Sequence, residues 1–236
     1  MFDIHMHLLP GVDDGAREPE MSLEMIRIAK SEGIRAIVAT PHSGYVPPAV
    51  IRKILENLKE SAARAGLDLP LYPGCEVYCS DMAMDSILSM LSGGKLLSLN
   101  DTRYVLTEFN PYTPCREAGV CLERLKAEGW NPVIAHAERH LLLAQEESFY
   151  REMVDMGCLI QCNAYSFAQE RKPEIRNYAH RLAAEEMIHF LGTDAHRPDH
   201  RPPMAAVGLR WLREHTGEDY FRRITEGNAR ELLGMG

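Results

Sequence analysis

The sequence has no apolar run that approaches the roughly 20 residues needed to span a bilayer. It also lacks a block of lysine and arginine: 34 acidic residues outnumber 26 basic ones, and the formal net charge is −8. These absences argue against a membrane span and against sequence-independent binding of nucleic acid. The first residues, Met1–His5, have the pattern of neither a signal peptide nor a transit peptide. We therefore expect the mature protein to begin there and to work in the cytoplasm.

The six cysteines do not form the motif of a thiol-based phosphatase. Such an enzyme needs an arginine six residues after its cysteine, so that the loop binds phosphate around a thiolate. The residues at these positions are Asp81, Asp85, Cys121, Ala127, Ala164 and Ala168. Without an export signal the cysteines are expected to be reduced, and Cys158 and Cys162 are expected to pack as small core residues. Neither a Walker A loop nor a Rossmann fingerprint is present.

What the sequence does have is a regular alternation of short apolar strands and amphipathic helices. The 236 residues are 45% hydrophobic and 25% charged, as in an ordinary globular protein. The strands are predicted at Phe2–His7, Ile34–Thr40, Leu71–Cys79, Tyr104–Phe109, Pro132–Ala137, Cys158–Asn163 and Ile188–Thr193. The helices are predicted at Glu18–Glu32, from Pro47 to just before Gly66, at Met82–Leu91, Ala118–Glu128, Leu142–Met156 and Glu174–Glu186, and twice more near the C-terminus.

This alternation predicts an α/β fold with a parallel sheet, either a barrel or an open sheet. Polar residues follow the apolar part of nearly every strand, at the end where (β/α) barrels keep their sites, whereas an open sheet gathers ligands at one switch point. We therefore predict a distorted seven-stranded (β/α) TIM-like barrel. No linker or internal repeat is visible, so a single domain over residues 1–236 is expected.

The polar residues after the strands are of the types that bind divalent metals. Strand alternation places His5 and His7 on one face, and Asp194 and His196 likewise. A lone histidine is more often a hydrogen-bonded core or rim residue, and a lone buried glutamate is usually half of an ion pair. Recurrence of these types weakens both interpretations, because buried carboxylates are costly without cations. The further candidates are His42, Glu76, Glu108 and His136, and the mixture suits Mn²⁺, Fe²⁺, Zn²⁺ or Co²⁺.

Four fragments resemble the polymerase-and-histidinol-phosphatase (PHP) superfamily, and within it the manganese-dependent bacterial protein-tyrosine phosphatases of the CpsB/YwqE type. The fragments are Asp3–Gly15, Val38–His42, Ile134–Arg139 and Thr193–His196. The resemblance continues to the region of Asn228, and an aspartate at position 14 is similar to the tyrosine-phosphatase branch. It implies a barrel that holds three metal ions: one on His5, His7, Glu76 and Asp194, a second on Asp14, His42 and His196, and a third on Glu108 and His136, with Glu76 as a bridge. Asp3 is expected either to support these ligands or to belong to the inner layer of the barrel.

The expected chemistry is attack on phosphorus by metal-bound hydroxide, with His136 and Asp194 essential as ligands. Neighbouring divalent ions lower the pKa of bound water enough to give hydroxide near neutral pH. Arg139, which matches the family motif His-x-Glu-Arg, and Arg201, which matches an Arg-Pro pair, are expected to bind the phosphoryl group; for each the alternative is a surface arginine. The positive charge of three divalent ions and two arginines would exceed the negative charge of the site carboxylates. A phosphate dianion would therefore be attracted to this site on an otherwise acidic protein.

Three classes of function remain at this stage. The resemblance implies a protein-tyrosine phosphatase that acts on the tail of a bacterial tyrosine kinase of exopolysaccharide or capsule synthesis. The alternatives are a small-molecule phosphatase of the histidinol-phosphate or nucleotide type, and a non-catalytic metal-bound regulatory module. Complete ligand sets argue against the third class. Two departures from the family pattern concern substrate choice: His140, where relatives often have an aromatic residue, and the segment Asn163–Glu170, which lacks a glycine. Tyr45, Tyr112, Tyr165 and Phe167 are expected either to line the mouth of the site or to be structural.

Overall fold

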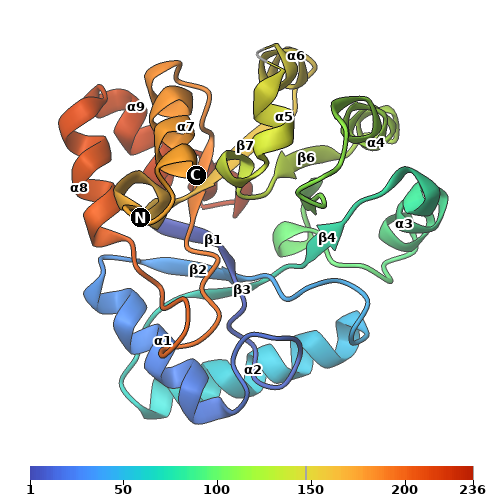
Figure 1. The fold of residues 1–236 in the computed structure, drawn as a ribbon. Coiled ribbons are helices and arrows are strands. Elements are labelled where there is room, and N and C mark those ends of the chain that lie inside the picture. The colour runs from blue at the N-terminus through green and yellow to red at the C-terminus, as the bar shows by residue number, and fades with distance from the viewer. Residues whose placement is uncertain (147, 236) are drawn as a thin grey trace.

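The computed structural model describes residues 1–146 and 148–235, over which parallel strands alternate with helices (Figure 1). The strands are β1 (Phe2–Met6), β2 (Ala36–Ala39), β3 (Leu71–Pro73), β4 (Glu76–Tyr78), β5 (Tyr104–Glu108), β6 (Asn131–Ile134), β7 (Leu159–Asn163) and β8 (Phe190–Gly192). Every pairing between neighbouring strands is parallel. The predicted α/β class is confirmed.

The strands form two sheets that two isolated bridges join. One sheet has the order β1-β2-β3 and the other β4-β5-β6-β7-β8. Met6 bridges to Ala195 after β8, and His42 after β2 bridges to Glu76 in β4. The arrangement is that of a distorted TIM-like barrel, as predicted, but its hydrogen bonding is not continuous. The first bridge lies at the carboxyl ends of β1 and β8, and the second joins the segment after β2 to the first residue of β4.

The predicted strand Leu71–Cys79 is divided between the two sheets. β3 pairs with β2, and after Gly74 and Cys75 the chain resumes as β4, which pairs with β5. A Cβ atom on Gly74 would lie 2.9 Å from a side-chain carbon of Val38, so only glycine lets the chain pass so close to β2. The break therefore places Glu76 at the start of a strand and at the seam between the sheets.

Figure 1 shows the helices around the outside of the strands. They are α1 (Pro19–Ser31), α2 (Pro48–Arg64), α3 (Met84–Ser92), α4 (Cys115–Ala127), α5 (Leu141–Gln145), α6 (Phe149–Asp155), α7 (Pro173–Ala184), α8 (Ala206–His215), α9 (Glu218–Arg222) and α10 (Asn228–Leu232). Proline in the first turn starts α1, α2 and α7, where its missing N–H has no helical partner to lose. The single helix predicted over Leu142–Met156 was wrong: α5 and α6 are separate, and position 147 lies outside the described residues.

Apolar side chains fill the space below the polar strand ends. Val38, Leu106 and Val133 pack in one cluster with Leu232 of α10. Leu106 lies on the same face of β5 as Glu108, two residues further on, so this face changes from apolar to acidic along the strand. Cys158 and Cys162 are fully buried, as predicted. Within the described chain, no helix has the length and apolarity required to cross a membrane.

Close packing of α8 provides a test of the fold. A Cβ atom on Gly208 would lie 1.7 Å from the backbone oxygen of Ala164, in the turn that follows β7. We expect Gly208→Ala to lower the free energy of unfolding by about 1–3 kcal/mol through overpacking. Chemical denaturation measures this change.

Gly119→Ala in α4 is the matched control, because a Cβ atom there meets no other atom within 4 Å. Alanine favours a helix interior over glycine by about 0.8–1 kcal/mol, so this variant should be as stable as the parent protein or more so. Equal destabilisation by both changes would contradict the packing described for α8.

Candidate metal centre

The carboxylate of Glu76 lies between four imidazole rings. Its Oε1 atom is 3.2 Å from Nε2 of His5 and 3.0 Å from Nε2 of His136. Its Oε2 atom is 3.2 Å from Nε2 of His7 and 3.1 Å from Nδ1 of His42. The Glu76 side chain is 1% exposed, so each of its oxygens faces two imidazoles and almost no solvent.

Asp194 closes the other side of the two β1 histidines. Its Oδ1 atom is 3.7 Å from Nε2 of His5 and 3.4 Å from Nε2 of His7. The same oxygen lies 3.7 Å from Nδ1 of His196. Because Asp194 is also almost fully buried, two carboxylates and two imidazoles face one another at the end of β1.

The more open part of the site holds the remaining predicted ligands. Oδ1 of Asp14 is 3.6 Å from Nε2 of His42 and 3.5 Å from Nε2 of His196. Glu108 at the end of β5 is 3.6 Å from Nδ1 of His42 and 3.7 Å from Nε2 of His136. The structure thus brings all nine residues predicted as metal ligands into one cluster.

Three overlapping groups in this cluster have ligand atoms within 4.8 Å of one another and could each hold a metal ion. They are His7, Asp14, His42 and His196; His5, His7 and Glu76; and His42, Glu76 and Glu108. The expected third set joined His136 to Glu108, whereas these groups place His42 there. His7 and His42 each belong to two groups, so distance alone leaves their assignment to one ion open.

Unusual backbone conformations turn several side chains into the site. Six non-glycine residues in the described chain have positive φ, and three of them are predicted site residues: His136 (34°), Asp194 (54°) and Arg201 (59°). Such conformations are costly for non-glycine residues and tend to occur at functional sites. The strand predicted over Pro132–Ala137 accordingly ends at Ile134, before the turn that directs His136 toward Glu76.

The charges in the cluster shift one another's pKa in opposite directions. Burial acts to raise the pKa of Glu76 and Asp194, but the imidazoles, His5 first, hold both values well below the usual range. Burial acts to lower the pKa of His5 and His7, yet the adjacent carboxylates raise the pKa of His5 and raise that of His7 well above its ordinary value. Glu76 and Asp194 therefore stay ionised and stabilise positive charge beside them.

The tautomers of the two β1 histidines fit a metal between them. Nδ1 of His7 lies 2.7 Å from Oδ2 of Asp13, and Nδ1 of His5 lies 3.1 Å from Oε1 of Gln161. If each Nδ1–H donates to its oxygen, each Nε2 presents a lone pair, and both Nε2 atoms are buried without a hydrogen-bond partner. Orphaned imidazole nitrogens that face carboxylate oxygens are the donor set that a divalent cation satisfies.

Asp13 is a functional candidate that sequence reasoning missed. Its side chain accepts hydrogen bonds from the backbone N–H groups of Gly15 and His42 as well as from His7. It thus fixes the His7 ring and the position of His42 together. The signal was present as a second aspartate beside Asp14, but the loop shape that separates their roles depends on Gly15, where a Cβ atom would lie 2.2 Å from the His7 oxygen.

Gln161 and Asn163 form a second supporting network that the sequence did not reveal. Oε1 of Gln161 accepts from the backbone N–H of His136, 2.7 Å away, while its Nε2 donates to Asn163. Asn163 in turn donates to Oδ2 of Asp194 at 3.3 Å. The available signal was two polar residues on one face of an otherwise apolar strand.

The two predicted phosphate-binding arginines lie together at the mouth. Arg139 and Arg201 both donate to Oδ2 of Asp194, the oxygen that faces away from the imidazoles. Nη1 of Arg201 also lies 3.2 Å from Nε2 of His196. Both arginines line a cavity of about 320 Å³ together with the exposed edge of the cluster. They are therefore placed where an anion could contact them and the ligands at once.

The remaining candidates divide between the core and the rim. Asp3 accepts hydrogen bonds from the backbone N–H groups of His5 and Thr193 and from the Thr193 hydroxyl, and it is fully buried. Burial raises the Asp3 pKa to about 6 and, with the positive field of His136, lowers the His140 pKa to about 3. Phe167 is 1% exposed and belongs to the core, whereas His140 is buried but lines the metal-facing cavity. Tyr165 does line a neighbouring cavity, while Tyr45 and Tyr112 are exposed.

Comparison of the sequence with known proteins identifies its family and its relatives. The family model described as capsular polysaccharide synthesis, CpsB/CapC, matches residues 1–234. The tyrosine-protein phosphatase YwqE of Bacillus subtilis is 34% identical over 237 residues, which cover 99% of this chain and 91% of that protein. The tyrosine-protein phosphatase CpsB of Streptococcus pneumoniae is 30% identical over 244 residues, with 99% and 98% of the two chains covered.

Solved structures give the same result. A crystal structure among those of YwqE from Bacillus subtilis and CpsB from Streptococcus pneumoniae, described as unique metal-dependent tyrosine phosphatases, matches with a TM-score of 0.89 and 33% identity over 99% of this chain and 94% of that one. A phosphotriesterase homology protein from Escherichia coli matches with a TM-score of 0.64 at 11% identity over 98% and 97% of the chains. The second likeness concerns the fold alone. The resemblance to the CpsB/YwqE type of tyrosine phosphatase, inferred from the four sequence fragments, is confirmed.

The contact between Asp13 and His7 predicts an effect on metal affinity. We expect Asp13→Asn to weaken Mn²⁺ binding roughly 10- to 100-fold, because loss of the carboxylate charge lowers the basicity of the His7 ring. Titration calorimetry with Mn²⁺ measures this change, and circular dichroism shows whether the variant folds. Asp219→Asn, at an exposed carboxylate in α9, is the control. Unchanged Mn²⁺ affinity in a folded Asp13→Asn protein would contradict the supporting role.

Proposed function

The chain belongs to the CpsB/CapC family of capsular polysaccharide synthesis, and from this premise we propose that it is a metal-dependent protein-tyrosine phosphatase. Its substrate is a phosphotyrosine-bearing protein, the tail of a bacterial tyrosine kinase of capsule or exopolysaccharide synthesis. The named relatives of this chain are tyrosine-protein phosphatases. This favours the first of the three functional classes over a small-molecule phosphatase and over a non-catalytic module.

The position of Glu76 is the observation that carries the proposal. One buried carboxylate has four imidazole nitrogens within 3.2 Å and lies at the base of a cavity whose rim has two arginines. Buried charges at this density are stable only when cations compensate them. The arrangement therefore supports a site for divalent ions that is open to an anionic substrate.

We assign three ions to these ligands, with Mn²⁺ as the proposed metal. His5, His7, Glu76 and Asp194 would hold one, Asp14, His42 and His196 a second, and Glu108 and His136 a third that shares Glu76. His7 serves a single ion in this assignment, because Asp13 occupies its Nδ1 atom and only Nε2 remains. When bound, the ions supply Lewis-acid activation of water and neutralise charge on the phosphoryl group.

The arginines bind and orient the phosphoryl group in this proposal. A guanidinium presents a planar fork that matches two phosphoryl oxygens. Arg139 and Arg201 both hold Oδ2 of Asp194, while Oδ1 of the same carboxylate faces His5 and His7. Asp194 thereby fixes the distance between the phosphate-binding groups and the imidazole cluster.

The burial and the raised pKa values of the cysteine thiols argue against a role as nucleophiles. A thiol reacts as its thiolate, which a positive environment must stabilise. All six are buried and unpaired among the described residues, and burial raises the pKa of Cys75 and Cys158 to about 12 and those of Cys115 and Cys121 to about 11. Unpaired thiols also agree with a reducing compartment, so a cytoplasmic location is part of the proposal.

Comparison of substrates with and without metal tests this function. We expect a phosphotyrosyl peptide to be hydrolysed with a kcat/KM at least roughly tenfold higher than that of histidinol phosphate, because the open rim suits a peptide. Chelation of Mn²⁺ should abolish turnover, and added Mn²⁺ should restore it. Preference for histidinol phosphate would favour a small-molecule phosphatase, whereas Mn²⁺ binding without hydrolysis would favour a regulatory module.

Two ligand variants and two controls sharpen this experiment. His136→Ala and Asp194→Ala should reduce turnover to roughly 1% or less while the chain stays folded, because each removes a group that faces Glu76 or His5. The exposed residues His215 and Asp219 provide the controls His215→Ala and Asp219→Ala. Full activity in either ligand variant would exclude that residue from the mechanism.

Arg139 makes a separate prediction about substrate binding. Arg139→Ala should lower kcat/KM for the phosphotyrosyl peptide roughly 10- to 100-fold, the effect of losing hydrogen bonds to a charged group. Steady-state kinetics at saturating Mn²⁺ measures the change, and Arg210→Ala, at an exposed position in α8, is the control. Kinetics equal to those of the parent protein would remove Arg139 from the phosphate site.

A further inference from the structure

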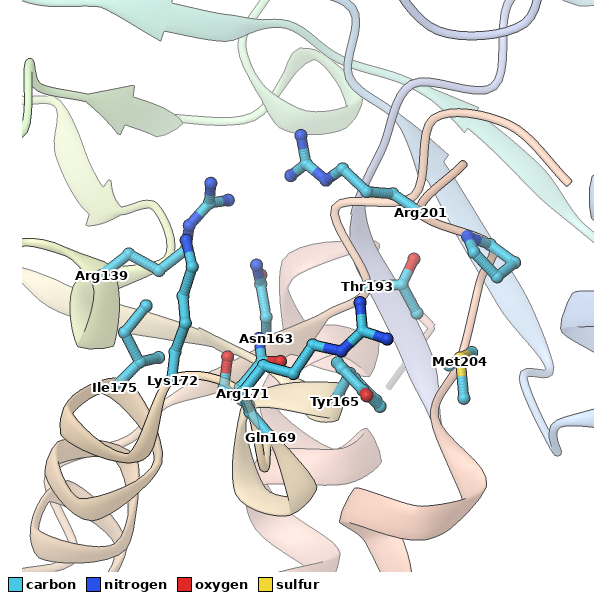
Figure 2. A pocket seen from close by; sticks show the side chains of 12 residues that line it. Arg139, Asn163, Tyr165, Gln169, Arg171, Lys172, Ile175, Thr193, Arg201 and Met204 are labelled. Atoms are coloured by element: carbon cyan, nitrogen blue, oxygen red, sulfur yellow. The ribbon is translucent and has the colours of Figure 1, made fainter. Parts of the chain in front are cut away.

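A second cavity, of about 570 Å³, adjoins the metal-facing one and is lined by cations without a carboxylate (Figure 2). The cations are Arg139, Arg171, Lys172 and Arg201. Arg139, Lys172, Ile175 and Arg201 line both cavities, so the two are continuous. The chain has a formal net charge of −8, so a cavity lined by four cations and no acidic residue is a local region of positive charge. The cavity therefore favours an anion next to the proposed reaction centre.

Two of these cations have no negative partner among the residues that the structure describes. Arg139 and Arg201 pair with Asp194, whereas no carboxylate of the described residues lies within ion-pairing distance of Arg171 or Lys172. Figure 2 shows Arg171 extending across the cavity toward Met204, and Lys172 pointing to the same side as the Arg139 guanidinium. The charges of Arg171 and Lys172 are thus available to a ligand.

The segments on either side of these two residues are anchored near the reaction centre. Arg171 and Lys172 precede α7, whose proline at the first turn and buried Ile175 hold the start of the helix in place. The preceding turn, Ala164–Ala168, is tied down by Glu138, which accepts from the hydroxyl of Ser166 at 2.7 Å. Glu138 is the neighbour of Arg139 in sequence. One buried carboxylate therefore connects the segment with Arg139 to the segment with Arg171 and Lys172.

We propose that Arg171 and Lys172, which extend along different walls of this cavity (Figure 2), form a cationic specificity subsite that attracts the side-chain carboxylates of aspartate or glutamate residues close to the phosphotyrosine of the substrate. This inference rests on the proposed phosphatase function and adds a sequence preference to it. Ile175, Met204 and Tyr165 give the cavity partly apolar walls, which suit an extended peptide. A second phosphate is the poorer occupant, because a dianion would compete for Arg139 and Arg201, which the reacting phosphoryl group needs.

Peptides that differ only in charge test this subsite. Phosphotyrosyl peptides with glutamate, glutamine or lysine at the positions flanking the phosphotyrosine are compared at low ionic strength, where exposed ion pairs are least screened. We expect the parent protein to favour glutamate over glutamine roughly 3- to 10-fold in kcat/KM, mainly through KM. The doubly substituted Arg171→Ala/Lys172→Ala protein should lose that ratio. A ratio between peptides is unaffected by a general loss of activity.

Charge reversal and a matched control complete the design. Arg171→Glu/Lys172→Glu should prefer the lysine peptide, whereas Lys53→Ala/Arg210→Ala, with both residues remote from the cavity lining, should keep the parent preference for glutamate. Equal rates for the charged and neutral peptides in the parent protein would overturn the proposal, as would a preference that survives in the double alanine variant. A gain seen only with a second phosphotyrosine would also overturn it.

The failure of this inference is distinct from the failure of the proposed function. If the parent protein with Mn²⁺ hydrolyses none of the phosphotyrosyl peptides, the proposed function is wrong. Fluorescence anisotropy with the same peptides then still decides the subsite, because its charge preference concerns binding. Stronger binding of the glutamate peptide that depends on Arg171 and Lys172 would support it, and equal binding of all peptides would end it.

Discussion

The structure depends above all on the contact between one buried carboxylate and the imidazoles around it. Glu76 has no solvent to stabilise its charge, and His5, His7, His42 and His136 approach it within 3.2 Å. Desolvation of a charged group costs several kcal/mol unless an opposite charge compensates it. The pKa of Glu76 is lowered and that of His5 is raised, because each charge stabilises the other. Divalent cations at this site would compensate the carboxylate charge without protonation of the rings.

The fold keeps this cluster in place with groups that touch no substrate. Asp13 fixes His7, Gln161 fixes both His5 and the backbone of His136, and Asn163 reaches Asp194. These contacts also hold the positive-φ backbone at His136 and Asp194, which would relax without them. Rigid rings with a single free nitrogen are better preorganised for a metal than mobile ones.

Sequence reasoning predicted the α/β class and eight of the nine proposed ligands from periodicity and from residue types near strand ends, whereas Asp14 came from the resemblance to the family and Asp13 was missed. It could not predict details that depend on contacts distant in sequence. The break between β3 and β4 follows from the approach of Gly74 to Val38, and the roles of Asp13 and Asp14 differ only because the loop turns at Gly15. Periodicity also predicted one continuous helix over Leu142–Met156, where the structure has the separate helices α5 and α6. At Gly74 and Gly15 tertiary packing overrode a local pattern.

Asp194 explains how a chain of net negative charge can bind an anionic substrate. One of its oxygens faces imidazoles and the other faces Arg139 and Arg201, so a single carboxylate contacts both halves of the site. If cations compensate Asp194 on the imidazole side, its attraction for the guanidinium groups weakens, and these become free to bind phosphate. Metal binding and phosphate binding would then be coupled through one residue. Arg171 and Lys172 lie outside this coupling because no carboxylate pairs with them in the described chain, so their charge attracts an anion whether or not the metals are bound.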